Sequence, residues 1–253
     1  TLEAFGLATK HRLGQNFLVE DNIIRKIIRL AELTSDDVVL EVGPGLGTLT
    51  VAMLDYVRAV CSIEADRELA GVLATTCKEP HQDSFVLCMG DALKATPQLV
   101  GDAYASLGVF ADTQGKEASG ALIGPNKFVS NLPYQVAATL ILLFFQEFTT
   151  LEQAVVMVQA EVADRIAAKP GTKAYGAYTA KLALYAQVSG RFEVAPGNFM
   201  PPPRVNSAVV RLERALMTDP SGTSVLTSEQ LAWVARVIDA AFTQRRKTIR
   251  NSM

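Results

Sequence analysis

The sequence predicts an α/β fold built on a doubly wound parallel sheet. Short apolar runs alternate along the chain with segments of helical periodicity. The first apolar run, 38–42, ends at a glycine-rich turn, and the next two end beside the carboxylates Glu64 and Asp91. Strand–helix repeats of this kind form parallel sheets with helices on both faces, and these sheets bind ligands at the carboxyl ends of their strands.

The first part of the chain predicts its elements in a regular order. Asp21 and Asn22 are residue types that favour helix N-caps, and the isoleucines after them recur at helical spacing. We therefore predict an amphipathic helix over 22–33. The elements that follow are a buried strand at 38–42, a turn at 43–47, a helix through about Tyr56, a strand at 57–63, a helix at 66–77 and a strand at 85–89.

Residues 101–125 interrupt this rhythm. They are rich in Gly, Ala, Ser and Asp and have no steady period, so we predict a long surface loop. Beyond it we predict strands at 127–131, 154–159, 192–194 and 207–212, helices at 135–148, 161–169 and 178–188, a linker at 218–227 and a final helix at 228–242. The linker divides the chain into a main domain, residues 1–217, and the start of a small helical C-terminal domain, residues 218–253.

Composition narrows the class of protein. The 253 residues are 49% hydrophobic and 20% charged, as in globular proteins, and the net charge is −2. Three cysteines without a CxxC pair predict free thiols in a reducing compartment, and the two histidines suggest no metal site. The strongest apolar stretch, 136–145, is too short to span a membrane, and no signal peptide is visible. We therefore expect a soluble, cytoplasmic monomer without membrane contact.

The sequence EVGPGLG, residues 41–47, lies between a predicted strand and a predicted helix. Its glycines allow the backbone to approach a ligand closely, although the spacing differs from that of the dinucleotide-binding motif. Glu64 can accept hydrogen bonds from ribose hydroxyls, and Asp91 from an adenine amino group. Each acid alone is more often a helix cap or a solvated side chain. Together, at successive strand ends, they predict a nucleoside cofactor.

The sequence SNLPY, residues 130–134, follows the next apolar run. The Asn131 side-chain oxygen and the Leu132 carbonyl can accept the two N–H bonds of the exocyclic amine of a flat base. Such acceptance would localise the nitrogen lone pair toward a methyl donor. Pro133 fixes the backbone, and Tyr134 offers a ring on which the base can stack. The alternative is a turn at a strand end with a tyrosine in the core.

A base-handling motif beside a nucleoside site favours S-adenosylmethionine (SAM) over a nicotinamide cofactor. The sulfonium of SAM already makes its methyl group electrophilic, so methyl transfer needs neither a metal nor a nucleophilic side chain. A second aromatic, Phe199, precedes the three prolines 201–203, which form a stiff extended segment. This segment could hold Phe199 over a pocket opposite Tyr134. The alternative is a core phenylalanine beside a rigid turn.

Seven motifs occur together along most of the chain. They are KHRLGQNFL at 10–18, EVGPGLGTLT at 41–50, IEAD at 63–66, GDA at 90–92, SNLPY at 130–134, FMPPPRVNSAVV at 199–210 and FTQRRKTIRNSM at 242–253. In this order they resemble the KsgA-type small-subunit rRNA adenine N6-dimethyltransferases, a Rossmann-like family of SAM-dependent enzymes. The resemblance implies that residues 1–217 form the methyltransferase catalytic domain.

The resemblance also implies a role for each matching residue. Gln15, Asn16 and Leu18 would cover the bound SAM, and Gly43 and Gly45 would line its methionine end. Glu64 would bind its ribose, and Asp91 and Ala92 its adenine. Asn131 is assigned to SAM as well. Those assigned to the target base are Asn131, Leu132 and Tyr134 at the amine, and Phe199 on the opposite face.

The implied activity is N6,N6-dimethylation of two adjacent adenosines in a hairpin loop near the 3′ end of small-subunit rRNA. The substrate would be a pre-assembled small ribosomal subunit, which places the enzyme in rRNA processing and ribosome biogenesis. One alternative is an Erm-type methyltransferase of large-subunit rRNA, although those usually carry NIPY or NIPF. Another is a non-catalytic assembly or transcription factor of the same fold, against which the intact Glu64, Asp91, Asn131 and Tyr134 argue.

Two features depart from the family pattern. The stretch 101–125 is longer and more polar than the family's, and the chain stops at Met253, where the family usually continues, so we expect a truncated C-terminal domain. Two basic clusters stand out against the acidic total: Lys10 with Arg12, and the segment 245–250 with Arg245, Arg246, Lys247 and Arg250. We expect the second cluster to contact RNA phosphate, with a solvated helix end as the alternative.

Overall fold

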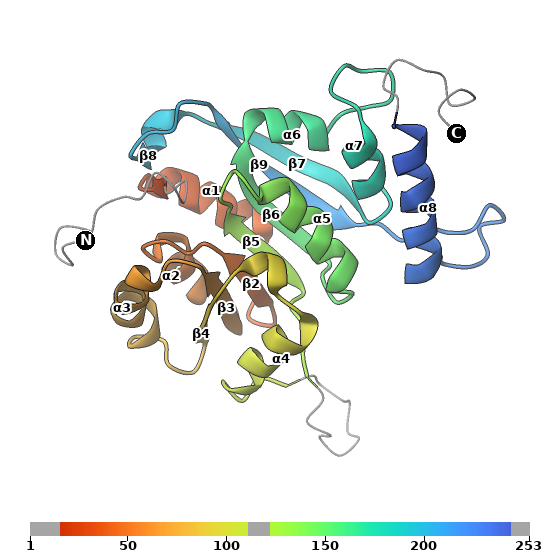
Figure 1. Cartoon of the computed structure of the whole chain (residues 1–253). Helices are drawn as coiled ribbons and strands as arrows, with labels where there is room; N and C mark the ends of the chain where they lie inside the picture. Colours follow the sequence, from red (N-terminus) through yellow and green to blue (C-terminus); the bar gives the residue numbers. More distant parts are fainter. Residues whose placement is uncertain (1–15, 111–121, 244–253) are drawn as a thin grey trace.

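The structure is a computed structural model that describes residues 16–110 and 122–243 (Figure 1). Its centre is a seven-stranded sheet in the order β4-β3-β2-β5-β6-β9-β7. The strands are β2 (Val38–Val42), β3 (Ala59–Glu64), β4 (Phe85–Met89), β5 (Lys127–Asn131), β6 (Gln153–Gln159), β9 (Ser207–Arg214) and β7 (Ala186–Val194). The predicted α/β fold is confirmed. The sheet is mixed, since β4 to β6 are parallel whereas β9 is antiparallel to both β6 and β7.

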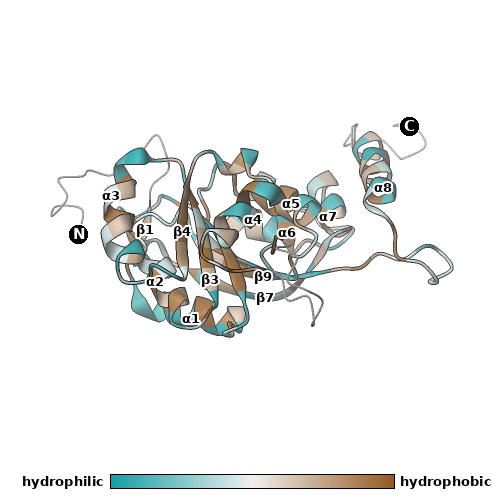
Figure 2. Cartoon of the chain, turned by 90° about the horizontal axis from the view of Figure 1, so that it is seen from below, coloured by the Kyte–Doolittle hydropathy of each residue, from teal (hydrophilic) through white to brown (hydrophobic). Residues whose placement is uncertain are grey.

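Helices cover both faces of the sheet. One face carries α1 (Asp21–Ala31), α2 (Thr48–Leu54) and α3 (Ala70–Leu73). The other carries α4 (Pro97–Ala105), α5 (Ala137–Glu147), α6 (Ala160–Ile166) and α7 (Ala177–Leu182). Viewed from below, the apolar strands lie between these two helical layers (Figure 2). The cysteines Cys61, Cys77 and Cys88 are free thiols, as predicted, and the first two are buried in the core.

The chain reverses its direction of travel across the sheet between β2 and β5. It runs outward from β2 through β3 to β4, then returns to place β5 on the other side of β2. In open α/β sheets the ligand crevice lies at such a switch point, outside the carboxyl ends of the strands. The topology therefore places the glycine-rich turn after β2 and the SNLPY motif after β5 on either side of this crevice.

The prediction of a loop throughout 101–125 is wrong for its first residues, which belong to α4. The Thr96 side chain caps this helix by accepting from the Leu99 amide at 3.2 Å. Val100 and Tyr104, one turn apart, are fully buried against the sheet. Gly101 is required by packing, because a Cβ there would lie 2.9 Å from the Leu122 Cβ. Residues 111–121 lie outside the described part of the chain.

The prediction of a helix over 178–188 is also wrong in its second half. Helix α7 ends at Leu182, and residues 186–194 form the edge strand β7 instead of the short predicted strand 192–194. This strand pairs with β9 over its whole length, with a bulge between Val188 and Gly190. Pairing with a distant strand thus overrides the helical spacing of the local apolar residues.

A small two-stranded ribbon joins two segments that are far apart in the sequence. Strand β1 (Phe17–Leu18) pairs antiparallel with β8 (Phe199–Met200), and Leu18 lies opposite Phe199. The sequence pattern did not predict this pairing. It brings the end of the motif at 10–18 against the start of the motif at 199–210, on the α1 face of the sheet.

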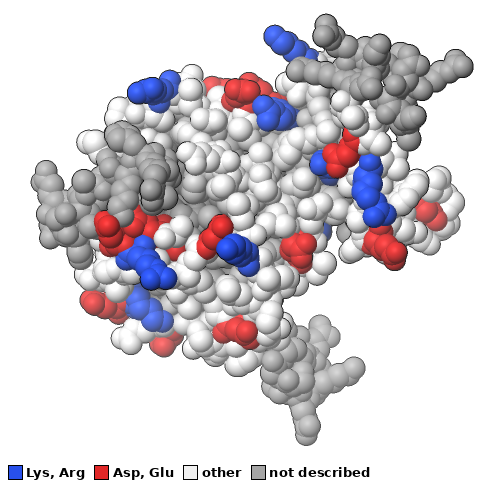
Figure 3. All heavy atoms as spheres, in the orientation of Figure 1, with Lys and Arg blue, Asp and Glu red and all other residues white. Residues whose placement is uncertain are grey.

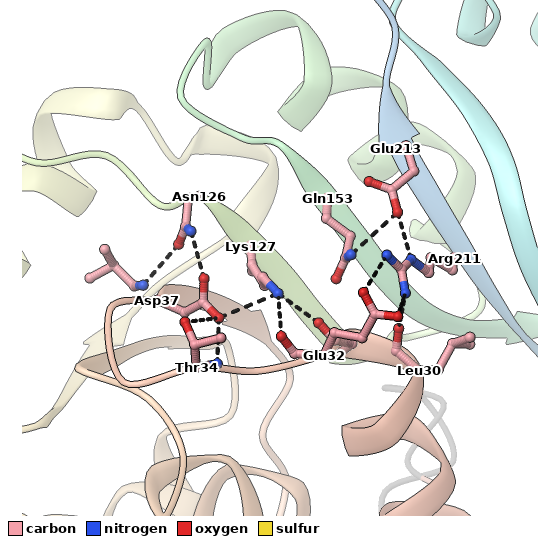
Figure 4. Close-up of polar contacts among 11 residues, drawn as sticks. Leu30, Glu32, Thr34, Asp37, Asn126, Lys127, Gln153, Arg211 and Glu213 are labelled. Atoms are coloured by element: carbon pink, nitrogen blue, oxygen red, sulfur yellow. Dashed lines mark hydrogen bonds and ion pairs between the residues drawn. The ribbon is translucent and has the colours of Figure 1, made fainter.

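A network of polar side chains fastens the C-terminus of α1 to the sheet (Figure 4). Glu32 ends the helix in a left-handed conformation with φ 48°. Its backbone oxygen and that of Ala31 accept hydrogen bonds from the buried Lys127 amine at 2.9 and 2.7 Å. Its carboxylate pairs with Arg211, at 2.8 Å. These partners satisfy carbonyl groups that a helix end leaves open, and they stabilise the strained residue.

The last described helix, α8 (Ser228–Ala241), follows the predicted linker 218–227 and begins with a capping box formed by Thr227 and Gln230. It contacts the main body through α7, where Lys181 pairs with Asp239 at 2.8 Å. It stands at the edge of the molecule in both views (Figures 1 and 2). The domain boundary at 217–218 stays a prediction. Within the described residues, no helix is long and apolar enough to cross a membrane.

Candidate active site

A cavity of about 240 Å³ lies at the carboxyl ends of β2, β3, β4 and β5. Ten of the predicted site residues line it: Asn16, Leu18, Gly43, Gly45, Glu64, Asp91, Ala92, Asn131, Leu132 and Tyr134. Gln15 lies outside the described residues, as does the basic segment at 245–250. Among the residues that the structure describes, no cluster of His, Cys, Asp or Glu side chains could hold a metal ion.

Phe199 is described but does not line the cavity. It is 3% exposed and packs with the apolar residues on the α1 face of the sheet, in the β1–β8 ribbon. The structure thus brings Phe199 to Leu18, which does line the cavity, but leaves the phenylalanine ring itself in the core. Its role as the second face of a base clamp stays a prediction that requires the ring to move.

The glycine-rich turn forms the wall of the cavity after β2. Gly43, Gly45 and Gly47 all have positive φ, at 67°, 60° and 82°, which glycine adopts without strain. A Cβ on Gly45 would lie 2.9 Å from the Phe17 ring, so this turn also leaves no room for a larger residue. The backbone itself therefore faces the ligand space at this wall.

Glu64 and Asp91 occupy the ends of the next two strands. Glu64 is 7% exposed, and one of its carboxylate oxygens accepts from the Asp66 amide at 2.8 Å. Burial raises the pKa of Glu64, against the lowering effect of nearby backbone amides. Asp91 is exposed and accepts from the Leu93 amide at 3.0 Å, so it caps the short helical turn that follows. Both carboxylates have a structural partner and line the cavity as well.

The SNLPY motif forms the opposite wall. The Asn131 side-chain nitrogen donates to the Asn16 carbonyl at 3.2 Å, and Asn131 lines the cavity. Pro133 adjoins the glycine turn, since a Cβ on Gly43 would lie 3.3 Å from the Pro133 Cγ. The predicted cofactor wall and the predicted base wall are therefore in contact.

Comparison with known proteins identifies the family. A sequence model described as ribosomal RNA adenine dimethylase matches residues 6–253. The chain belongs to this family. The resemblance predicted from the seven motifs is thereby confirmed, and with it the assignment of the chain as an rRNA adenine methyltransferase that uses SAM.

Individual members support the assignment to this dimethylase family. The chain is 40% identical over 248 residues to the ribosomal RNA small subunit methyltransferase A of Streptomyces griseus, covering 97% of this chain and 75% of the relative. It is 37% identical to the protein of the same name from Magnetococcus marinus, covering 100% of this chain and 81% of the relative.

Solved structures of related enzymes have the same fold. A dimethyladenosine transferase from Plasmodium falciparum matches with a TM-score of 0.71 and 26% identity, over 93% of this chain and 74% of that one. The 23S rRNA methyltransferase ErmE matches with a TM-score of 0.68 and 26% identity, over 94% of this chain and 83% of that one. The Rossmann-like methyltransferase architecture of the dimethylase is thus shown.

One acidic residue of the cavity was missed by the sequence reasoning. Glu41 is the last residue but one of β2, is 1% exposed and lines the cavity. Its carboxylate accepts hydrogen bonds from Thr50 at 2.7 Å and Ser62 at 2.6 Å. Burial raises the pKa of Glu41 to about 7, although both hydroxyls act in the opposite direction. The sequence feature that could have identified Glu41 is that it is the single acid inside the apolar run VVLEV.

We expect the stability of the Glu41→Gln variant, relative to that of the wild type, to rise with pH between about 4.5 and 7. The folded protein holds a proton on Glu41 up to about pH 7, whereas the unfolded chain releases it near 4.5. Wild-type stability therefore falls relative to the variant as the pH rises between these values, by up to roughly 3 kcal/mol. Denaturant unfolding of both proteins from pH 4.5 to 8.5 measures this difference. A constant difference across the range would contradict the assignment.

Proposed function

We propose that this dimethylase transfers methyl groups from SAM to N6 of two adjacent adenosines in a hairpin loop near the 3′ end of small-subunit rRNA. The substrate in this proposal is the pre-assembled small ribosomal subunit. The observation that carries it is the contact between the glycine turn after β2 and the SNLPY motif after β5. This contact puts the residues that we assign to SAM beside the residues that we assign to the adenine amine, in one cavity.

The chemistry requires an adenine amine whose lone pair points at the methyl group. SAM, when bound, supplies an electrophilic methyl group on its sulfonium. The Asn131 side-chain oxygen and the Leu132 carbonyl accept the two amine hydrogens and so turn the lone pair out of conjugation with the ring. Asn131 is held for this task by its own bond to the Asn16 carbonyl. Leu132 is held by the bond of its amide to the Met157 carbonyl, at 3.1 Å.

We assign the SAM contacts to the opposite side of the cavity. The Glu64 carboxylate accepts from backbone amides, among them that of Asp66, and its remaining lone pairs would accept from the ribose hydroxyls. Asp91 and Ala92 are placed to meet the adenine, and the backbone at Gly43 and Gly45 to meet the methionine end. Asn16 and Leu18 cover the cavity from the β1 segment, in keeping with the order of the motifs in the sequence.

Two observations favour this proposal over its alternatives. The relatives at 37–40% identity are named small-subunit enzymes, whereas the ErmE structure shares 26% identity. A non-catalytic role would not require an acceptor set at the cavity wall, yet Asn131, Leu132 and Tyr134 all line it. We also propose that the enzyme acts as a monomer in the cytoplasm.

Methylation of isolated small subunits tests the proposed function. Small subunits that lack N6-methylated adenosines are incubated with the enzyme and radiolabelled SAM, and the labelled nucleotides are mapped. We expect two methyl groups on each of two adjacent adenosines near the 3′ end of the rRNA. A parallel reaction contains large-subunit rRNA in place of the small subunits. Label there alone would favour the Erm-type alternative, and absence of label in both reactions would favour the non-catalytic one.

We expect Tyr134→Ala to impair capture of the target adenine more than SAM binding. Stacking of a base on an aromatic ring contributes about 1–3 kcal/mol, which corresponds to roughly a five- to 150-fold change in affinity.

For Phe199, the variant Phe199→Leu tests the same role, since it keeps an apolar side chain in the core and removes the ring face. Subunit affinity and turnover, compared with SAM affinity, measure both effects. Unchanged turnover of Phe199→Leu would assign residues 199–204 a structural role.

Contacts with rRNA outside the cavity are proposed to involve phosphate. On the face shown in Figure 3, acidic and basic side chains are interspersed over the described residues. This mixture agrees with the acidic total of the chain. The basic segment at 245–250 therefore remains our proposed phosphate contact, with Lys10 and Arg12 as the second choice.

A further inference from the structure

Ser207 contacts the tyrosine of the SNLPY motif from a distant part of the chain. Its hydroxyl and that of Tyr134 share a hydrogen bond at 2.6 Å, although the residues are 73 positions apart. Ser207 is fully buried, and Tyr134 lines the cavity with its ring partly exposed. The bond therefore joins a residue of the cavity wall to an interior one.

The position of Ser207 is fixed by the sheet. It is the first residue of β9 and pairs with Gln159 of β6 on one side and Val194 of β7 on the other. Strand β6 pairs in turn with β5, where Met157 lies opposite Asn131. Ser207 is thus connected through two strand pairings to the residue that we assign to the target amine.

Tyr134, by contrast, lies in the turn between β5 and α5 and is held by no strand pairing. An aromatic ring on a turn can rotate about its side-chain bonds unless a second contact restrains it. The hydroxyl oxygen lies on the Cβ–Cγ axis and far from the Cα–Cβ bond, so a contact at this atom acts on rotation about the Cα–Cβ bond. A hydrogen bond from that atom to a residue fixed in the sheet therefore restrains the place that the ring occupies.

We propose that Ser207 is a positioning residue, which holds the Tyr134 ring in the place where it receives the target adenine. This inference rests on the proposed function, because it takes Tyr134 as the surface on which the base stacks. Ser207 itself touches neither the base nor SAM. The alternative is that the two hydroxyls merely satisfy each other inside the protein, as buried polar groups do.

Removal of either hydroxyl should slow methylation without weakening SAM binding. We expect Ser207→Ala and Tyr134→Phe each to lower kcat/KM for small subunits lacking N6-methylated adenosines, by about threefold to tenfold, the value of one hydrogen bond. The double variant should be no slower than the slower single variant, since both changes remove the same bond. The SAM dissociation constant should stay within twofold of the wild type.

Thr179→Val is the matched control for general destabilisation. The buried Thr179 hydroxyl donates to the Arg165 carbonyl at 2.7 Å, and Thr179 does not line the cavity. This variant should therefore lose a buried hydrogen bond and keep the wild-type kcat/KM. An equal loss of kcat/KM in Thr179→Val would overturn the positioning role.

Two other outcomes would also overturn the positioning role. One is that folded Ser207→Ala keeps a kcat/KM within twofold of the wild type. The other is that the loss of kcat/KM in the double variant equals the product of the losses in the two single variants. Because Tyr134→Phe removes the same bond and retains an aromatic side chain, the test does not depend on whether Ser207→Ala folds. Tyr134→Ala separates this inference from the proposed function. Wild-type turnover of Tyr134→Ala would refute stacking itself, whereas a slow Tyr134→Ala beside an unaffected Ser207→Ala would refute only the inference.

Discussion

Replacement of Asn131 by alanine is expected to lower the rate of methyl transfer by about 10²–10³, the usual effect of removing one positioned polar group. The physical reason is the loss of the acceptor that turns the adenine amine toward the sulfonium methyl. The fold should persist, because Asn131 is the last residue of β5 and its side chain bonds to the Asn16 carbonyl in the cavity wall. Single-turnover methylation of small subunits measures the rate.

Asn126→Ala is a matched control, because Asn126 immediately precedes the opposite end of β5. The Asn126 side chain donates to Asp37 at 2.7 Å and accepts from the Val38 amide at 2.9 Å (Figure 4). None of these three residues lines the cavity. Loss of the Asn126 side chain should reduce the free energy of unfolding by about 1–3 kcal/mol, the usual cost of leaving buried partners unpaired. The methylation rate of the folded protein should not change. A rate for Asn131→Ala within a few-fold of the wild type would refute the catalytic role.

Glu64→Ala is expected to weaken SAM binding tenfold or more. The ribose would lose an acceptor on a charged group, and such hydrogen bonds contribute about 1.5–3 kcal/mol. Part of the loss arises from the protein itself, because the Asp66 amide also loses its partner at 2.8 Å. Calorimetric titration with SAM measures the affinity directly and needs no rRNA.

Glu68→Ala separates a specific ribose contact from a general effect of charge. Glu68 is an exposed carboxylate four residues further along and does not line the cavity. Loss of this charge should leave the SAM affinity within about twofold of the wild type. If folded Glu64→Ala bound SAM as tightly as the control does, the ribose assignment would be wrong.

The cavity-lining elements were largely predictable because their signals are local. The run VVLEV is buried at every position, and the glycines after it all take positive φ. Parallel pairing then brings the carboxyl ends of neighbouring strands to one edge, which places Glu64, Asp91 and Asn131 around one cavity. Spacing along the sequence was therefore sufficient to identify this edge.

The features that the sequence did not predict depend on distant partners. Strand β7 forms through its pairing with β9, and helix α4 through burial of Val100 and Tyr104 against the sheet. The β1–β8 ribbon joins residues about 180 positions apart, and it explains why Phe199 is buried. Glu41 was missed because only the fold shows that its strand opens into the cavity.

The capping of α1 by Lys127 also gives this lysine an unusual chemical environment. Its amine is bonded to the Ala31 and Glu32 carbonyls and lies 3.3 Å from the Asp37 carboxylate, with the residue 9% exposed. An acylating reagent can reach this nitrogen only after the end of the helix detaches from the sheet. Its labelling rate, divided by that of the exposed Lys173, would therefore report the free energy of this local opening. Lys127 is thus a built-in reporter of how firmly the helix that follows the β1 segment is anchored.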